Sequence, residues 1–259
     1  MMIGSEFLKP DFTIVRRTET ANLLALIKEL MPHDCGKELI RLGGQGDGGY
    51  LIPDDLEGIE YCFSPGVGTL SRFESDLADL GIKSFLADFS VDGPSVNRPE
   101  FTFDKKFLGP SDHGDFITLA SWKDKYIKNY MGDFILQMDI EGGEYEVILN
   151  APDALLNQFR IMVIEFHRLN SLLDLFAFSF MSSVFRKILH NFEVAHIHPN
   201  NCSDSLQVDD IEIPRVMEFT FLNKRRVSSR KLLDMFPHKL DEDNTADAPA
   251  LHLPRCWFS

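Results

Sequence analysis

The sequence predicts an α/β protein built on an open, largely parallel sheet with helices on both faces. From Glu57 onward, apolar runs of strand length alternate with segments of helical periodicity. Strands this apolar are typical of sheets that are covered on both faces. A glycine-rich turn, Ser64 to Thr69, separates the first of these strands from the helix that follows it. This is the pattern of a βαβ unit with a ligand at its turn.

Composition favours one large domain with short extensions. The 259 residues include 44% apolar residues and 22 Phe, enough to form a substantial core. We expect an N-terminal helical extension over residues 1–40, a main domain over 41–236 and a C-terminal tail over 237–259. The tail lacks a periodic pattern, so we expect it to lie along the surface or to be mobile. Gly4-Ser5-Glu6-Phe7 is what two adjacent cloning sites would encode, so residues 1–7 carry no expectation about the fold.

Charge and cysteine usage exclude several classes of protein. Lys and Arg total 26 against 40 Asp and Glu, a net charge of -14, so extended nucleic acid is not an expected partner. No apolar run approaches the roughly 20 residues of a membrane span, and no basic segment precedes an apolar one at the start. We therefore expect a cytoplasmic protein. Its four cysteines lack CxxC spacing, which predicts reduced thiols rather than zinc ligands or disulfides.

Two elements precede the alternating region. Thr20 to Met31 carries Leu and Ile at helical spacing and ends before Pro32, which predicts a helix. Arg41 to Pro53 holds five glycines in thirteen residues, a density that predicts a structured loop or hairpin.

The alternating region begins with one complete βαβ unit. Its strands are expected at Ile59–Phe63 and Lys83–Phe89, with an amphipathic helix at Leu70–Leu80 between them. Four further strands are expected at Asp133–Ile140, Arg160–His167, Glu193–His198 and Val216–Leu222, with a helix between the second and third of these.

The first βαβ unit has the features of an adenosine site. Gly66-Val67-Gly68 forms the turn, and Asp88, which ends the next strand, lies 22 residues after Gly66. An acidic residue at this position can accept hydrogen bonds from both ribose hydroxyls. The third glycine of the diphosphate-binding turn is missing, so a nucleoside without a diphosphate is the better match. The alternative interpretation is a tight βα turn with a surface aspartate.

A second candidate segment, Leu136 to Leu149, runs from a buried strand into carboxylates and two glycines. Asp139 and Glu141 share one face of the strand, and ligands in open α/β sheets bind beyond such strand ends. Asp139 ends an apolar run and is therefore interpreted as a site residue. Glu144 and Glu146 fall at a helix start, where carboxylates favour the helix dipole, and are interpreted as helix-start charges.

Five segments in order resemble one family. LQMDIEGGEYEVIL, residues 136–149, resembles the hallmark of FkbM-type methyltransferases. CFSPGVGTLSRFESDLADLGIKSFLADFS, residues 62–90, resembles the cofactor-binding segment of a methyltransferase-like subgroup found in animals. DGGYLIP, VIEFH and HIHPNN resemble further motifs of that subgroup. Together the segments extend from about Arg41 to Leu222.

The resemblance implies a Rossmann-like class I methyltransferase with a mostly parallel seven-stranded sheet. It implies S-adenosylmethionine as methyl donor and an oxygen acceptor on a sugar, glycan or related small metabolite. By position, Gly66 and Gly68 would pass under the donor. Asp88 would hold the ribose beside Phe89, and Asp139 would lie close to the transferred methyl group.

One departure from the wider methyltransferase pattern affects the donor site. Ser64-Pro65 stands where many methyltransferases have an acidic residue that contacts the amino acid part of the donor. Glu74 or Asp47 could take that role, and the sequence does not choose between them.

Methyl transfer to an alcohol requires alignment of the acceptor and removal of its proton. His167 ends a strand and shares a face with Glu165, so it could be an imidazole oriented by a carboxylate, and it is our first choice of base. The residues expected to bind the acceptor are Glu141, His198, Asn200 and Asn201.

Other readings of the same groups stay open. A divalent cation such as Mg²⁺ or Mn²⁺ could be held by Asp139, by Glu165 or His167, and by His198, and it would acidify neighbouring sugar hydroxyls. The acceptor could be a nitrogen or an RNA, or the chain could be a noncatalytic cofactor-binding module. The basic run at Lys224–Lys231 is interpreted as a solvated loop.

Overall fold

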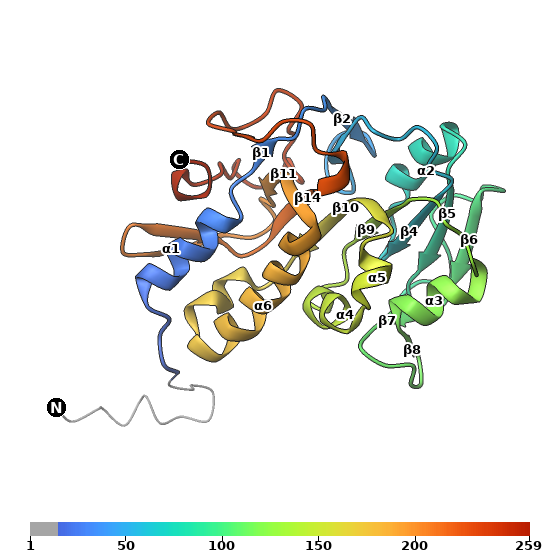
Figure 1. Ribbon diagram of the computed structural model, residues 1–259, viewed down its shortest axis with the longest axis horizontal. Helices are drawn as coiled ribbons and strands as arrows, with labels where there is room; N and C mark the ends of the chain where they lie inside the picture. The colour runs from blue at the N-terminus through green and yellow to red at the C-terminus, as the bar shows by residue number, and fades with distance from the viewer. Residues whose placement is uncertain (1–14) are drawn as a thin grey trace.

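A seven-stranded sheet forms the centre of the computed structural model, which describes residues 15–259 (Figure 1). The strands lie in the order β11-β14-β10-β9-β4-β5-β6. In chain order they are β4 (Tyr61–Pro65), β5 (Lys83–Ala87), β6 (Phe101–Asp104), β9 (Phe134–Met138), β10 (Phe159–Phe166), β11 (Phe192–Pro199) and β14 (Met217–Asn223). Residues 1–7, whose Gly4-Ser5-Glu6-Phe7 matches what two cloning sites would encode, lie outside the described residues.

The predicted α/β class and mostly parallel seven-stranded sheet are confirmed. Strands β4, β5, β6, β9 and β10 pair in parallel, and β14 pairs antiparallel with both β10 and β11. The chain moves outward from β4 to β6 and then returns to β9 beside β4. Strand order therefore reverses between β4 and β9, which is where open α/β sheets bind ligands.

Six of the seven strands lie where the sequence predicts them, within two residues or so at each end. The seventh, β6, was not predicted individually. It has four residues, FTFD, of which only Asp104 is buried, so it lacks the continuous apolar run that marks the inner strands.

Five helices cover one face of the sheet (Figure 1). Fully buried aromatic side chains such as Phe63, Trp122 and Phe134 fill the space beneath them. Leu23 and Leu26 belong to the same core, so the expected N-terminal extension is packed into the main domain. The five helices are α1 (Thr20–Glu29), α3 (Leu119–Tyr126), α4 (Glu144–Asn150), α5 (Asp153–Leu156) and α6 (Leu175–Asn191).

The opposite face is covered by α2 (Arg72–Asp79) and by the hairpin of β2 (Leu39–Leu42) and β3 (Tyr50–Pro53). The hairpin alternative for the glycine-rich segment is therefore confirmed, with the glycines in its loop. The Thr220 hydroxyl donates to the carbonyl of Leu51 at 2.6 Å, which ties the hairpin to β14. Within residues 15–259, no helix is both long enough and apolar enough to cross a membrane.

Short elements complete the described chain. Two-stranded pairs form between β1 (His33–Asp34) and β15 (Lys231–Leu232), between β7 (Phe107–Leu108) and β8 (Phe116–Ile117), and between β12 (Ser205–Val208) and β13 (Ile211–Pro214). The 3-10 helices are η2 (Leu169–Leu173), η3 (Lys224–Arg226) and η4 (Arg255–Trp257).

The C-terminal tail, which was expected to lie along the surface or to be mobile, is anchored to the domain by side-chain contacts. Trp257 is fully buried and its indole donates to the carbonyl of Glu212 at 2.9 Å. The Asn244 amide donates to Glu218 at 2.7 Å. Leu253 and Trp257 join the helical-face core, which explains why a segment without periodicity is ordered.

Asp55 joins the loop after β3 to η3. Its carboxylate accepts two hydrogen bonds from Arg226, at 2.7 and 2.6 Å, and one from Lys37 at 3.0 Å. The hydrogen bonds from Arg226 outweigh burial and lower the pKa of Asp55 to about 2. Because the folded state then binds the proton less tightly than the unfolded state, the ion pair stabilises the fold at neutral pH.

We expect Asp55→Asn to lower the free energy of unfolding by about 2 kcal/mol at pH 7. The difference from wild type should persist above about pH 5 and close as the pH falls from about 4 toward 2, because the wild-type carboxylate then takes up a proton. Urea unfolding at pH 7, 5 and 3 measures it, with the neighbouring, exposed Asp54→Asn as control. An equal difference at pH 7 and pH 3 would contradict this account.

Candidate functional site

A cavity of about 340 Å³ opens at the carboxyl ends of β4 and β9, at the point where strand order reverses. Its wall is formed by the turn after β4, the end of β5, the start of α2, the loop of the β2–β3 hairpin, the end of β9 and β7. We call it the switch-point cavity. The candidate residues that line it are Asp47, Gly66, Gly68, Glu74, Asp88, Asp139 and Glu141.

The glycine turn is clamped between two strands. The amide of Gly66 donates to Ala87 of β5, and the amide of Asp139 donates to the carbonyl of Pro65. Gly66 has a φ of +83°, and a Cβ built there would lie 1.5 Å from the Asp139 carbonyl oxygen. Gly68 has a φ of +49° with open space at its Cβ position. The first glycine is therefore required by packing, and the second leaves room above the turn.

Asp88 lies in the cavity wall against the turn. Its carboxylate accepts from the amide of Gly68 at 2.9 Å and from the amide and hydroxyl of Ser90, each at 2.7 Å. These bonds fix the side chain and use three of its about four acceptor positions, so one position remains, on Oδ2. Phe89 does not line the cavity; its ring packs 5.2 Å from that of Phe107, which does. The sequence analysis missed Phe107 because β7 is only two residues long.

Of the residues considered for the donor's amino acid part, Glu74 and Asp47 line the cavity and Ser64 does not. Ser64 is fully buried, and its hydroxyl contacts both the Glu74 carboxyl and, at 2.7 Å, the Gln137 side-chain oxygen. One hydroxyl proton cannot serve two acceptors, so the second contact takes its proton from Glu74 or from the Gln137 amide. Burial raises the pKa of Glu74.

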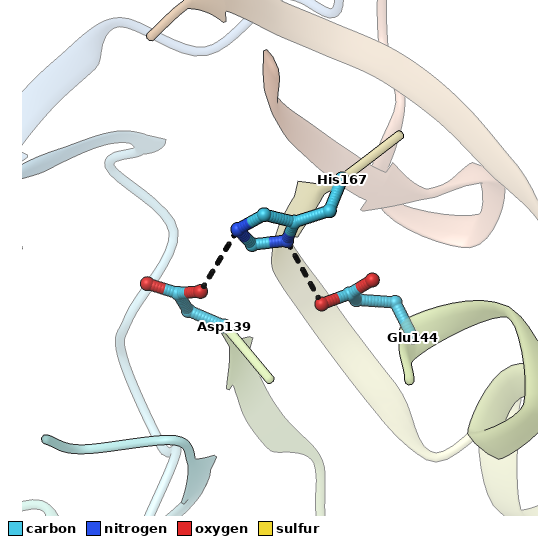
Figure 2. A group of neighbouring side chains, drawn as sticks. All are labelled: Asp139, Glu144 and His167. Atoms are coloured by element: carbon cyan, nitrogen blue, oxygen red, sulfur yellow. Dashed lines mark hydrogen bonds and ion pairs between the residues drawn. The ribbon is translucent and has the colours of Figure 1, made fainter. Parts of the chain in front are cut away.

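His167 lies between two carboxylates at the far end of β10 (Figure 2). Its Nδ1 is 3.1 Å from Glu144 Oε1, and its Nε2 is 3.8 Å from Asp139 Oδ1. One ligand atom from each of Asp139, Glu144 and His167 lies within 4.8 Å of the others. The three residues therefore form one cluster beside the switch-point cavity.

Glu144 does more than the helix-start charge that the sequence suggested. It does open α4, but its side chain is fully buried, and its Oε1 also accepts from the amides of Ile140 at 3.1 Å and Gly142 at 3.0 Å. Glu141 and Gly142 have positive φ values of 58° and 107°, which turns the chain back toward its own strand end. The two glycines of EGGE, residues 141–144, were the signal in the sequence for this turn of the chain.

Two further carboxylates approach His167 Nε2. Glu141 Oε2 and Glu165 Oε1 each lie 3.5 Å from it. The Glu141 side chain is 89% exposed and that of Glu165 is 5% exposed, so one faces solvent and the other the interior. Asn200 donates to Glu165 Oε1 at 3.0 Å. This residue, which the sequence predicts to bind the methyl acceptor, therefore contacts the cluster through Glu165.

The cluster gathers four carboxylates around one imidazole. Burial, partly opposed by the nearby His167, raises the pKa of Asp139 to about 7. Burial and the charges of Asp139 and Glu218 raise the pKa of Glu165. For His167, burial acts to lower the pKa, but Glu144, Asp139 and Glu141 together raise it. Every carboxylate here would be stabilised by a neighbouring positive charge.

His198 and Asn201 contact the C-terminal tail. His196 Nε2 contacts Asp241 at 2.8 Å and His198 Nδ1 lies 3.8 Å from the same carboxylate. Asn201 donates to the Thr245 carbonyl at 2.8 Å. Strand β14 lies between β11, which carries His198, and β10, which His167 follows. Of the predicted metal set, Asp139 and His167 lie together with Glu144 in the cluster, and the role of His198 stays a prediction.

No protein-family model matches the chain, and no curated protein sequence matches it. The resemblance to FkbM-type methyltransferases stays a prediction that rests on the quoted motifs.

The two glycines of the turn offer a matched test of the cavity. We expect Gly66→Ala to destabilise the protein strongly, since its Cβ would overlap the backbone of β9, and to abolish ligand binding. Gly68→Ala should fold at a cost of about 1–2 kcal/mol, the usual penalty for this backbone conformation. Thermal unfolding followed by circular dichroism measures the stability of both variants. Equal effects of the two substitutions would show that β4 and β9 are not clamped as described.

Proposed function

We propose that this protein is an S-adenosylmethionine-dependent methyltransferase that methylates a hydroxyl of a sugar, glycan or related small metabolite. The observation that supports this best is the switch-point cavity, which is lined by Asp88 beside the glycine turn and by Asp139 after β9. A nucleoside held at the first would direct its substituents toward the second. His167 lies just beyond, where an acceptor would meet the donor.

The cavity suits an adenosine ligand with a positively charged side chain. Its volume of about 340 Å³ lies in the range of small-ligand sites. Asp88 retains an acceptor position on Oδ2 for a ribose hydroxyl, and Phe107 and Leu108 supply an apolar wall for a base. No third glycine follows the turn, which fits a ligand without a diphosphate.

The donor's amino acid part would lie toward Asp47 and Glu74. Asp47 reaches the cavity from the hairpin loop, and Glu74 reaches the same cavity from α2. An ammonium group would provide the charge that favours the ionised form of Glu74. Asp47 and Glu74 would thus take the role of the carboxylate that Ser64-Pro65 lacks. Both residues stay candidates, as in the sequence.

The sulfonium supplies the electrophilic methyl group, so the chain has to align the acceptor and accept its proton. Removal of that proton falls to the groups at this end of the cavity, Asp139 and His167. Glu144 holds the ring through Nδ1, which directs Nε2 toward Asp139. A noncatalytic binding module would have no use for such a pair. A methyltransferase with a nitrogen or RNA acceptor would use the same cavity for its donor, and the assays below distinguish these acceptors.

Calorimetry with S-adenosylhomocysteine tests the donor site. Asp88→Asn should weaken binding about 10- to 100-fold, because a charged acceptor of ribose hydrogen bonds contributes roughly 1.5–3 kcal/mol. Asp92→Asn is the matched control, since that side chain lies on the following loop, is 97% exposed and pairs with Lys105. Undetectable binding to wild type, or equal binding to both variants, would contradict the proposed donor site.

Turnover with labelled donor and a panel of acceptor sugars, amines and short RNAs tests the reaction. We expect Asp139→Asn to bind S-adenosylhomocysteine within a few-fold of wild type but to transfer methyl at least about 100-fold more slowly. Methylation of amines or RNA alone would replace the hydroxyl acceptor in the proposal. Full activity of Asp139→Asn would remove Asp139 from the reaction.

A further inference from the structure

The imidazole of His167 is fixed in the way that metal-binding histidines are. Glu144 Oε1 already accepts from two backbone amides, so it accepts the Nδ1 proton as a third donor. A histidine ligand typically donates its second ring nitrogen to a buried carboxylate in this manner. Nε2 is then left with its lone pair facing the carboxylates of Asp139, Glu141 and Glu165.

The distances around Nε2 are longer than hydrogen bonds and slightly longer than the separation of ligands around one ion. Asp139 Oδ1 lies 3.8 Å from Nε2, and Glu165 Oε1 lies 3.5 Å from it. Hydrogen bonds from ring nitrogens to oxygens are about 2.7–3.2 Å long. Neighbouring ligands that each lie about 2.1 Å from one cation are about 3.0–3.4 Å apart in octahedral or tetrahedral sites. A small inward movement of the two carboxylates would complete such a site.

Buried oxygens at this place have no donor. Glu165 Oε2, Asp139 Oδ1 and Glu144 Oε2 have no hydrogen-bond partner among residues 15–259, and only 5% of the Glu165 side chain is exposed. A buried carboxylate oxygen without a partner is costly and normally signals a bound group. In the part of the chain that the structure describes, the ion pairs of Asp139, Glu141, Glu144 and Glu165 all go to His167. Four carboxylates thus share one imidazole.

We propose that His167 Nε2, Asp139 and Glu165 bind a divalent cation, with Glu144 as the residue that orients the histidine. Two carboxylates and one imidazole suit Mn²⁺ best among the common oxygen-preferring cations. The exposed Glu141 is a flexible fourth carboxylate at the solvent side. The set leaves out Glu144 of the tightest group of three, because its Oε1 is occupied by two backbone amides and by His167 Nδ1.

The role of this cation, though not its binding, rests on the proposed function. Two neighbouring hydroxyls of the acceptor would take the open positions, which selects acceptors with a vicinal diol. The cation lowers the pKa of the bound hydroxyl, whose O–H bond breaks and whose proton passes to Glu141 and then to solvent. The oxygen lone pair forms the new bond to the methyl carbon, and the C–S electron pair returns to sulfur. In this arrangement His167 is a ligand and not the base.

Titration of the full chain with Mn²⁺ alone, followed by electron paramagnetic resonance, tests the site. We expect one Mn²⁺ per chain in wild type, with electron spin-echo modulation from a coordinated imidazole nitrogen. Asp139→Asn should weaken binding at least 10-fold, and Glu144→Gln should weaken it about 10-fold as an orienting residue. Glu146→Gln removes an equal charge from the exposed side of the same helix turn and should bind as wild type does.

Each outcome separates this inference from the proposed function. Failure of wild type to bind Mn²⁺, binding without a nitrogen signal, or equal binding by Asp139→Asn would overturn the cation site even if S-adenosylhomocysteine binds. Methyl transfer that continues at full rate in chelator would overturn the role of the cation and keep the methyltransferase. Binding of Mn²⁺ without any binding of S-adenosylhomocysteine would keep the cation site and remove the methyltransferase.

Discussion

The hydrogen bond between the amide of Asp139 and the carbonyl of Pro65 is the contact on which both halves of the site depend. It joins the ends of β4 and β9 where their outgoing chains separate, one toward α2 and the other toward α4. Gly66 is needed there because any side chain would strike the Asp139 carbonyl. A single backbone junction therefore positions the glycine turn on one side and the Asp139 carboxylate on the other. The switch-point cavity and the carboxylate cluster are therefore held by the same contact.

The sheet also explains why so many ionisable groups are buried on one face. Alternate residues of β10 and β14 point to opposite faces, so Glu165 and Glu218 lie opposite the phenylalanine-rich core formed by Phe166 and Phe219. The core face is closed by five helices, whereas the other is covered by a glycine-rich hairpin and a polar tail. Apolar packing on one face thus gives the stability that permits costly carboxylates on the other.

Sequence reasoning located what depends on local pattern. Apolar strand runs fixed six strands, and the Gly66 turn with Asp88 marked the cavity. Local pattern could not reveal contacts that form where the chain turns back on itself. Glu144 looked like a helix-start charge because its link to His167 depends on the positive φ values of Glu141 and Gly142. His198 looked like a neighbour of His167 because both end strands, yet the antiparallel β14 is inserted between those strands, and periodicity along a chain does not specify strand order.

The tail shows how a segment without pattern can still determine the site. The Asn244 carbonyl accepts from the amide of Asp47, and the Asn244 side chain donates to Glu218. The side-chain amide of Asn201 holds the Thr245 backbone, because its nitrogen donates to the Thr245 carbonyl and its oxygen accepts from the Thr245 amide. The tail therefore connects the antiparallel edge of the sheet to the hairpin loop that walls the switch-point cavity. Because Asp47 lines that cavity from an exposed loop, its position depends on residues almost two hundred places later in the chain, and the functional domain must extend through the tail.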